Sequence, residues 1–445
     1  MNPPWIKYLP SALRTRIENG PVLLGILDNT GWLFADKVLR LAIGLFVGVW
    51  LARYLGPEQY GLMNYAIAIV GLFGAIASLG FSGIVVRDLV RAPDTANATL
   101  GTAFLLQVLG GFLAFVLAIA VIGFARPEDD LARLMVAVLG FSMVFKAADV
   151  VKYWFESRVA SRYVVWVESG VLIGLAAVKV WFILIEAPLI TFVWVLLAEV
   201  MLASIGLMGM YVWRGGALGR WHVRVDRAKS LLRDSWPMIL SGLAVMVYMR
   251  IDQVMLGQIL GDEAVGIYSV AVRISEVWYF MPMAIVASVF PSIVQARQQD
   301  EMAYYHKLQK LHNLMVLLAL IVAIPTTFLS DWLVVFLFGE PYRQAGAILA
   351  LHVWTGLFVF LGVASSSWYL SENLQTLAFY RTLLGVSINI LANWMLIPAY
   401  GVLGAAWGTI LSQLAAAYLF DGLNAGTRRM FRMKTTAIIS FYKVF

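Results

Sequence analysis

Long apolar stretches recur along this chain, and they constrain its fold more than any other feature. An α-helix crosses a bilayer core with about 20 apolar residues, and the 445-residue sequence offers twelve such stretches. Hydrophobic residues make up 61% of the chain and the mean hydropathy is +0.81, outside the range of soluble globular proteins. The sequence therefore predicts an all-α integral membrane protein with twelve transmembrane helices. Their approximate spans are 30–52, 60–84, 98–123, 131–155, 162–185, 188–212, 234–257, 266–293, 308–330, 344–370, 375–398 and 402–424.

Basic residues are distributed unevenly among the loops between these stretches. One set of loops and both ends of the chain carry most of them, whereas the other set carries Arg53, Arg126 and Arg343 beside several acids. Because basic loops stay in the cytoplasm, this pattern predicts that both termini are cytoplasmic. We expect residues 1–28 to be a cytoplasmic arm rather than a secretory signal, and residues 426–445 to be a basic cytoplasmic tail.

A short motif occurs twice, 205 residues apart. Leu55–Ala66 is "LGPEQYGLMNYA" and Leu260–Ala271 is "LGDEAVGIYSVA". Each copy follows the first helix of a six-helix half, so the halves enter the membrane from the same side, as in transporters built from parallel repeats. The plainer alternative is that both copies are ordinary turns. The repeat predicts an N-lobe at 29–213 and a C-lobe at 234–425, joined by a basic cytoplasmic linker at 214–233.

Charged residues lie inside the predicted membrane spans of the second half. The stretch "MRIDQVMLGQILGDEAVGIYSVAVRISE" contains Arg250, Asp252, Arg273 and Glu276. A charge at the membrane centre costs roughly 3 to more than 10 kcal/mol, so it usually marks a functional pathway. Arg250 and Arg273 are equally far along the chain from the centre of the Gly261–Asp262 turn, about 17 Å at ~1.5 Å per residue, and we expect them to form one shelf. A structural Arg273–Glu276 pair is the alternative.

In the first half, charges enter the membrane spans from the cytoplasmic side. Asp36, Lys37 and Arg40 lie in the first span, with Asp36 and Arg40 four residues apart on one helix face. Lys146 and Asp149 begin a charged stripe in the fourth span. Snorkelling to the headgroups is the alternative for Asp36 and Lys37. Together with the second half, these residues predict a charged route across the membrane rather than a single site.

The fifth and sixth spans add three more charges. Glu168 and Lys179 are eleven residues apart and share nearly one helix face, and Glu199 lies in the next span. A structural pair that locks helices together is an alternative to a functional role for Glu168 and Lys179.

Signatures of catalysis and nucleotide use are absent from the sequence. No phosphate-binding loop of the Walker type occurs, the four histidines show no metal-binding spacing, and there is no cysteine. All predicted outer loops are short, which leaves no room for a transferase domain. We therefore expect a protein that is not an enzyme, with no cofactor and no nucleic-acid partner.

Three segments resemble a known transporter family. They are "DNTGWLFADKVLRLAIGLFVGVWLARYLGPEQYGLMNYA", "LGFSGIVVRDLVR" and "DQVMLGQILGDEAVGIYSVAVRISE" followed by "FPSIVQ". This pattern resembles the polysaccharide-transporter family, the O-antigen flippases of the multidrug/oligosaccharidyl-lipid/polysaccharide exporter superfamily. The resemblance implies a V-shaped, two-lobed, alternating-access transporter of the bacterial cytoplasmic (inner) membrane. Its implied cargo is an undecaprenyl-diphosphate-linked oligosaccharide, moved from the inner to the outer leaflet.

The chemistry of that cargo suggests roles for the charged and polar residues. Arginine binds phosphate oxygens through paired hydrogen bonds, so a cationic cavity for the diphosphate is expected from Arg40, Arg250, Arg273, Lys37 and Lys146. The candidates for glycan contact are Asn64, Gln107, Tyr248, Gln253 and Tyr268. The candidates for coupling or charge pairing are Asp36, Asp149, Asp252 and Glu276.

Transport without a nucleotide site needs another source of energy. We expect a proton or another ion, or the cargo gradient itself, to drive the movement, with Glu276 as the first candidate for the coupling group. A polysaccharide polymerase or export machinery is a further expected partner beside the lipid bilayer. The competing functions are a peptidoglycan-precursor flippase, a drug or cation antiporter of the same superfamily, and a membrane glycosyltransferase or ligase.

Overall fold

Helices are the only regular elements in the part of the chain that the structure describes. It is a computed structural model that describes residues 21–443, with side chains from residue 29 onward apart from Thr30. The prediction for the first 20 residues lies outside this range. In a bilayer an unsatisfied backbone N–H or C=O is costly, so apolar segments fold into helices whose backbone groups bond within the segment. The predicted all-α membrane class is confirmed.

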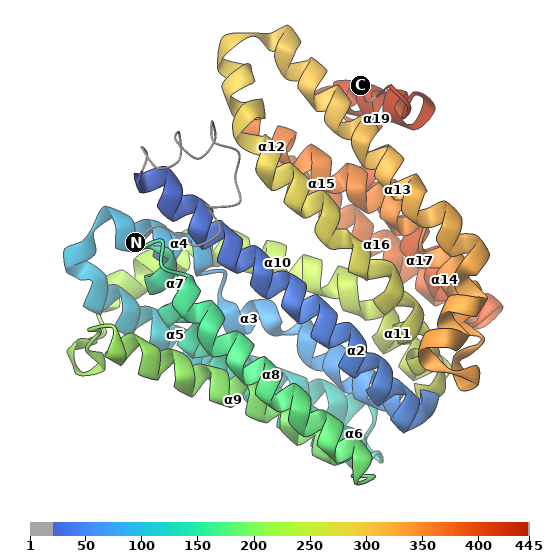
Figure 1. Ribbon diagram of the computed structural model, residues 1–445, viewed down its shortest axis with the longest axis horizontal. Coiled ribbons are helices and arrows are strands. Elements are labelled where there is room, and N and C mark those ends of the chain that lie inside the picture. The colour runs from blue at the N-terminus through green and yellow to red at the C-terminus, as the bar shows by residue number, and fades with distance from the viewer. Residues whose placement is uncertain (1–20, 444–445) are drawn as a thin grey trace. The chain divides into compact units, whose positions relative to one another are not determined.

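Contacts divide the chain into two compact units. Unit 1 contains residues 1–51 and 73–242, and unit 2 contains residues 52–72 and 243–445. The helices of unit 1 are the first part of α2 (Pro21–Leu72), α3 (Gly74–Ser78), α4 (Ser82–Arg91), α5 (Ala96–Ala125), α6 (Asp130–Phe145), α7 (Asp149–Glu156), α8 (Arg162–Leu184), α9 (Leu189–Trp213) and the first part of α10 (Val225–Ile259). Within this unit α5 packs beside α6, and α8 beside α9 (Figure 1).

Unit 2 contains the remaining helices. They are the later parts of α2 and α10, followed by α11 (Asp262–Glu276), α12 (Phe280–Gln299), α13 (Glu301–Phe338), α14 (Ala345–His352), α15 (Thr355–Ser371), α16 (Gln375–Tyr400), α17 (Val402–Leu414), a π-helix (Ala415–Leu419), α18 (Phe420–Leu423) and α19 (Arg428–Ile439). The lobe boundaries expected from the sequence remain predictions, and the contacts assign 52–72 to unit 2 rather than to the unit of its sequence neighbours.

The membrane-spanning stretches match the expected spans with one difference. Among the described residues, 11 helical stretches are long and apolar enough to cross a membrane. The first, Gly31–Leu72, has 42 residues and contains most of the first expected span and only residues 60–72 of the second. The rest of the second expected span lies in α3 and at the start of α4. It is interrupted at Gly56, whose φ of 72° is not helical and favours glycine, and Pro57 follows. Two expected helices are therefore joined at a sharp bend.

The repeated motif makes a reciprocal contact within unit 2. A Cβ atom on Gly61 would overlap the carbonyl oxygen of Asp262, and one on Gly266 would overlap the carbonyl oxygen of Pro57. Gly61 and Gly266 are 205 residues apart, as are Pro57 and Asp262. The two turns thus contact each other through equivalent atoms. This supports a parallel repeat, and superposition of the complete halves remains a prediction.

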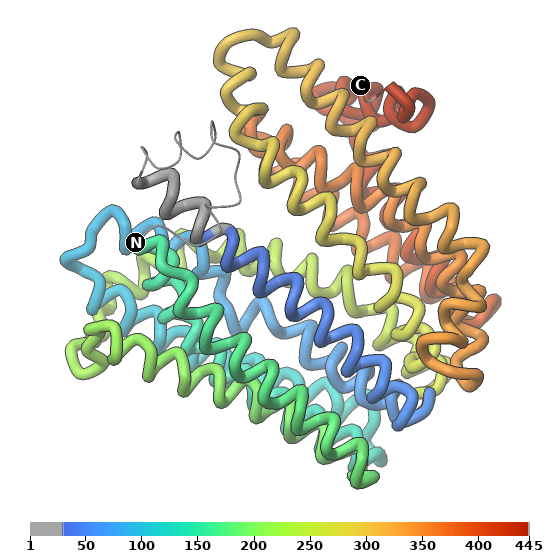
Figure 2. The backbone as a smooth tube through the Cα atoms, in the orientation of Figure 1, coloured from blue at the N-terminus to red at the C-terminus, as the bar shows by residue number. Residues whose placement is uncertain are grey.

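The C-terminal basic segment folds back on unit 2 as helix α19. Its side chains Met430 and Met433 belong to the same buried apolar cluster as Leu308 and Met315 of α13. Figure 2 shows this last helix beside the first half of α13, and contacts between the two helices agree. Residues 428–439 are therefore a docked helix rather than a free tail.

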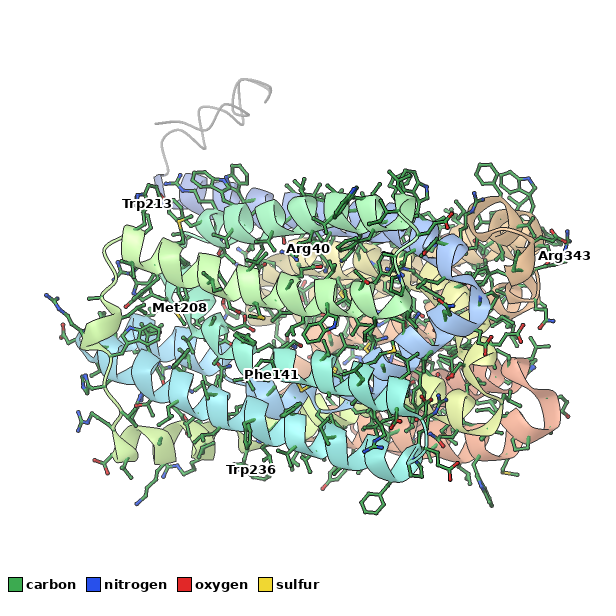
Figure 3. The ribbon with its side chains drawn as sticks, turned by 90° about the horizontal axis from the view of Figure 1, so that it is seen from below. Arg40, Phe141, Met208, Trp213, Trp236 and Arg343 are labelled. Carbon is green, nitrogen blue, oxygen red and sulfur yellow. The ribbon has the colours of Figure 1, made fainter. Side chains whose placement is uncertain are left out.

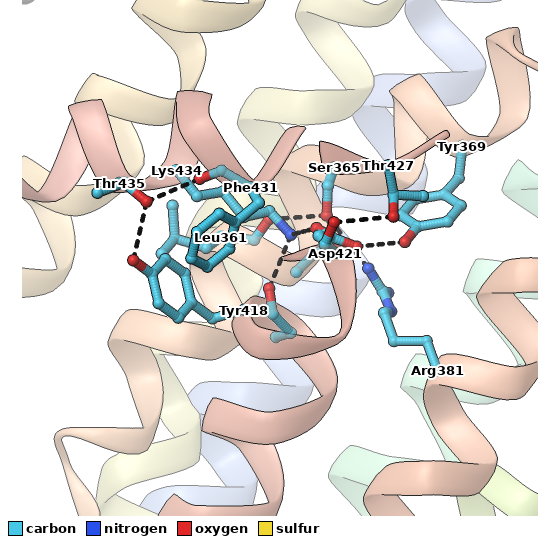
Figure 4. A network of polar contacts seen from close by, with 12 residues as sticks. Leu361, Ser365, Tyr369, Arg381, Tyr418, Asp421, Thr427, Phe431, Lys434 and Thr435 are labelled. Carbon is cyan, nitrogen blue, oxygen red and sulfur yellow. Dashed lines mark hydrogen bonds and ion pairs between the residues drawn. The ribbon is translucent and has the colours of Figure 1, made fainter. Parts of the chain in front are cut away.

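A fully buried ion pair fixes α19 in place. Lys434 Nζ lies 2.6 Å from Asp421 Oδ2, and both side chains have 0% exposure. The same ammonium donates to the carbonyl of Ala417, at 2.7 Å, in the π-helix. Tyr369 donates to the other oxygen of Asp421, and the guanidinium of Arg381 lies over the Tyr369 ring (Figure 4). This network joins α15, α16, the π-helix, α18 and α19 of unit 2.

Candidate functional site

A charged cavity lies inside unit 1. It has a volume of about 160 Å³ and is lined by residues of α2, α7, α8 and α9 and of the break between α6 and α7. Three predicted site residues line it, namely Arg40, Lys146 and Asp149. Figure 3 shows Arg40 partway along the helices, whereas Trp213 lies at the end of α9. The cavity is therefore at a depth where charged residues usually have a function.

Most charges around this cavity are paired. Arg40 Nε lies 2.8 Å from Asp36 Oδ2, and Arg40 Nη2 lies 2.7 Å from Glu168 Oε2. The second oxygen of Glu168 lies 2.5 Å from Lys152 Nζ, which also contacts Asp149 at 2.9 Å. The expected i, i+4 pair of Asp36 and Arg40 is confirmed. Glu168 on α8 connects it to the stripe on α7, so the charges form one network.

The cavity is balanced rather than strongly cationic. Its lining has three basic and three acidic side chains, which are Arg40, Lys146, Lys152, Asp149, Glu168 and Glu199. Lys179 neutralises Glu199 at 2.8 Å. Neither an ion pair nor a side-chain hydrogen bond is present for Lys146 among the described residues. The region therefore lacks the expected excess of positive charge, and among the described residues Lys146 is the one base of the lining without a carboxylate partner.

Lys146 also occupies an irregular part of the backbone. Residues Lys146–Ala148 form a short 3₁₀ turn between α6 and α7, within one membrane-spanning stretch. A 3₁₀ segment inside a helix often marks a functional hinge, and broken helices are typical of substrate sites in transporters. Lys146 therefore lies at a break in the helix and also carries a charge that no described carboxylate neutralises.

Two other predictions for the first half have different outcomes. Lys37 is exposed on α2 and does not line the cavity. Gln107 is buried, where its amide donates to the Ser78 carbonyl at 3.0 Å and to Tyr153 Oη at 3.3 Å. A buried amide that holds neighbouring helices together is not available to a glycan in this conformation.

The arginines of the second half contact the 57–72 arm of α2 at separate points. Arg273 Nη1 donates to Tyr60 Oη at 2.6 Å. The side chain of Arg250 lies 3.6 Å from the position that a Cβ atom on Gly71 would take. Tyr60 and Gly71 are eleven residues apart, about 16 Å along a helix. The two side chains therefore do not meet in one shelf in this conformation.

Asp252 is the centre of a buried polar network in unit 2. Its exposure is 5%, and Oδ2 accepts hydrogen bonds from Thr409 at 2.7 Å and Tyr268 at 2.9 Å. The other oxygen accepts from Asn393 Nδ2 at 3.0 Å, and Asn393 also donates to Asn389 at 3.1 Å. All these donors are neutral. No lysine or arginine forms an ion pair with Asp252 in the described part of the chain.

The other candidates near Asp252 are unequal. Tyr268 and Gln253 are buried, and Gln253 donates to Ser269 at 3.4 Å, so neither suits direct glycan contact. Tyr248 is half-buried and accepts a hydrogen bond from Ser412 at 3.4 Å. Asn64 donates to the carbonyl of Tyr60 within its own helix, at 2.7 Å.

Glu276 has a different setting from Asp252. It ends α11 and precedes a 3₁₀ turn, Val277–Tyr279. It is half-buried, and the charges of Arg250 and Asp252 act on it. A structural Arg273–Glu276 pair, the alternative given above, is not among the ion pairs of the described residues. Glu276 is thus partly exposed, whereas Asp252 is enclosed.

Sequence comparison identifies related proteins along most of the chain. A family model described as a polysaccharide biosynthesis protein matches residues 50–347. The probable flippase AglR of Haloferax volcanii is 24% identical over 407 residues, which cover 87% of this chain and 80% of that protein. A putative O-antigen transporter of Shigella flexneri is 24% identical over 420 residues, which cover 89% of this chain and 98% of that protein.

Two solved transporter structures have a similar fold. The lipid II flippase MurJ, in an inward closed conformation, has a TM-score of 0.71 at 14% identity and covers 94% of this chain and 92% of its own. An inward-facing multidrug resistance transporter of the MATE family has a TM-score of 0.68 at 15% identity, with coverage of 91% and 96%. These similarities show the fold.

Proposed function

Because the chain belongs to the polysaccharide biosynthesis protein family, we propose that it is a flippase for a lipid-linked oligosaccharide. The cargo is an undecaprenyl-diphosphate-linked glycan, such as an O-antigen or another surface polysaccharide repeat unit. It moves from the inner to the outer leaflet of the bacterial cytoplasmic membrane by alternating access. Both termini then lie in the cytoplasm. Relatives named as a flippase and an O-antigen transporter support this function.

The strongest support for a cargo site is that Lys146 lines the cavity without an ion-pair partner among the described residues. The other basic residues around the cavity already bind carboxylates, so an anion would compete with them for Arg40 or Lys152. Lys146 needs no such exchange and lies at a break between helices. We therefore assign the first contact with the cargo diphosphate to Lys146. Arg40 is a second contact once the anion displaces Glu168.

The rival functions differ in how well these charges suit them. A drug or cation antiporter is expected to hold its cargo with free carboxylates, yet three of the cavity's acids are paired with bases. A peptidoglycan-precursor flippase carries a diphosphate as well and differs in the sugar. A membrane glycosyltransferase or ligase would need a catalytic domain, which neither relative's name suggests. A polymerase or export machinery remains a predicted partner.

Transport measured in liposomes tests this proposal. The probe is a polyprenyl diphosphate that carries a fluorescent oligosaccharide, and its arrival in the opposite leaflet is read with a membrane-impermeant quencher. Lys146→Gln should slow flipping by about 10- to 100-fold, because a hydrogen bond to a charged group contributes roughly 1.5–3 kcal/mol. Lys229→Gln, an equal charge change at an exposed residue of α10, should leave the rate nearly unchanged.

Two results would contradict parts of the proposal separately. An inactive native protein with every polyprenyl-linked sugar would contradict the flippase function. Native-like flipping by Lys146→Gln would contradict the role of this cavity and leave the function standing.

Asp252 is our candidate for ion coupling, in place of Glu276. A buried carboxylate that is held only by neutral donors retains an uncompensated charge, which is costly in an apolar environment. A proton or a monovalent cation would neutralise it. Binding and release of that ion would then alter the contacts among α10, α11, α16 and α17, which supply the network residues. Such a change could bias one conformation over another.

Ion gradients distinguish the two carboxylates. In liposomes with imposed proton or sodium gradients, Asp252→Asn should flip cargo at a rate that no longer responds to the gradient. Glu276→Gln should keep the response of the native protein. The opposite result would return the coupling role to Glu276, and equal rates under every gradient in the native protein would leave the cargo gradient as the driving force.

A further inference from the structure

Three arginines gather around one aromatic cluster at the end of unit 1 where α7 and α9 end and α8 begins. The guanidinium carbon of Arg158 lies 4.0 Å from the centre of the Trp154 ring. The guanidinium carbons of Arg162 and Arg214 lie 4.8 Å and 4.5 Å from the centre of the Tyr163 ring. The ring of Phe155 contacts the rings of both Trp154 and Tyr163 and so connects them. The three charges are therefore neighbours.

The charges in this cluster have no acidic partners among the described residues. No carboxylate lies within 4 Å of Arg158, Arg162 or Arg214 in the part of the chain that the structure describes, and all three are exposed. Glu156, the nearest acid in sequence, is exposed and pairs with none of them. Arg40 in the same unit, by contrast, binds two carboxylates. A guanidinium that stacks on a ring keeps its N–H edges free, and these edges match the oxygens of a phosphate.

Apolar side chains surround these charges. Trp213 is 67% exposed, Val159 is 50% exposed and Trp166 is 47% exposed. Figure 3 shows Trp213 at the end of α9. Tryptophan is enriched at the level of the lipid headgroups, where one side of the ring is apolar and the other is wet. The cluster therefore combines a cationic centre with a rim that suits lipid.

The loop that carries Arg158 is held in an unusual conformation. Val159 has a φ of 53°, which is a genuine outlier for a β-branched residue. The backbone N–H of Ser161 donates to Asn29 Oδ1 at 2.7 Å, which ties the loop to α2. Such backbone strain costs on the order of 1–3 kcal/mol and tends to persist at functional positions.

We propose that Arg158, Arg162 and Arg214 form a binding site for the phosphate of a membrane lipid. The ligand is a lipid with an anionic phosphate or diphosphate headgroup, from the leaflet on the basic, cytoplasmic side. The guanidinium edges bind the phosphate oxygens, and the exposed side chains of Trp213 and Val159 contact the apolar part of the lipid. The site does not depend on which cargo the protein transports.

Lipid binding to the purified full-length protein tests this site. Native mass spectrometry gives the apparent affinity for short-chain phosphatidylglycerol, farnesyl diphosphate and phosphatidylcholine. Arg158→Gln/Arg214→Gln should lower the affinity for an anionic lipid by roughly 30-fold. Each basic residue near a membrane surface raises the affinity by about the same factor, and the two factors multiply. Arg162 is left intact because it donates to Tyr163 Oη at 2.8 Å.

A matched control separates the site from general electrostatic attraction. Arg220→Gln/Arg224→Gln removes two exposed charges from the loop before α10 and should change affinity less than twofold. Within the described residues no aromatic ring stacks on either arginine. A selective loss with phosphatidylglycerol identifies a bulk phospholipid as the ligand, and a selective loss with farnesyl diphosphate identifies a diphosphate lipid. Equal losses in both double variants, unchanged affinity, or equal binding of phosphatidylcholine would overturn the proposal. The melting temperature of each variant verifies that it is folded.

Discussion

Removal of either member of the buried pair between Asp421 and Lys434 should strongly destabilise unit 2. Both side chains have 0% exposure, and their charged atoms are 2.6 Å apart. Lys434→Met would leave the Asp421 carboxylate buried with the hydroxyl of Tyr369 but no cation. Asp421→Asn would leave the buried ammonium with the carbonyl of Ala417 as its other partner. In each case an uncompensated charge remains inside the protein.

The expected magnitude follows from that burial. Breaking a buried ion pair by the loss of one partner typically costs about 3–5 kcal/mol, whereas replacement of both partners costs much less. We therefore expect each single variant to lose this amount of the free energy of unfolding. For Lys434→Met/Asp421→Asn the loss should be at least about 2 kcal/mol smaller than the sum of the two. A single loss of this size lowers the melting temperature by on the order of 10 °C for a unit of this length.

Thermal unfolding of purified protein in detergent measures these changes. Arg429→Met is a matched control on the same helix, because Arg429 pairs with Glu301 at 2.9 Å while the two side chains are 54% and 70% exposed. An exposed pair contributes about 0–1 kcal/mol to stability. The melting temperature of Arg429→Met should therefore differ from that of the native protein by a few degrees at most. If the single variants match this control, or if the double variant loses the full sum, the reasoning from burial is wrong.

Two further outcomes are expected. Gly61→Ala should unfold at a lower temperature than Gly123→Ala, because a Cβ atom at Gly61 overlaps the backbone of α11 whereas one at Gly123 meets nothing within 4 Å; equal melting temperatures would contradict this contact. Asn393→Ala should lower the free energy of unfolding by about 1–3 kcal/mol, because Asp252 then lacks a buried hydrogen-bond donor. Unchanged stability in a denaturant titration would argue against the network.

The sequence predicts the membrane fold well because hydropathy and helix length are local properties. Charge pairing depends on neighbours from other helices, and it was predicted less well. Asp36 and Arg40 pair as their i, i+4 spacing indicates. Glu168 and Lys179 share a helix face, yet each takes partners from other helices. Periodicity gives the direction of a side chain but not the helix that it meets.

The sequence also contains an indication of the Asp252 network. Asn389 and Asn393 are four residues apart in an otherwise apolar helix, so they share one face. Polar residues inside a membrane helix usually need partners, which makes this spacing a usable indication of a buried acceptor. Lys434 gave no such indication, because a lysine in a basic segment near the end of a chain is normally solvated.

The reciprocal contact between the two repeated turns bears on the origin of the chain. Gly61 faces α11 through the same atoms with which Gly266 faces α2. An interface in which equivalent residues exchange places is the kind that two identical subunits make about a two-fold axis. A half-length ancestor could therefore have made this contact with a second copy of itself before gene duplication and fusion joined the copies. Each glycine would then have inherited its constraint from one ancestral position, and a larger residue could have entered neither copy without a change in the opposite one.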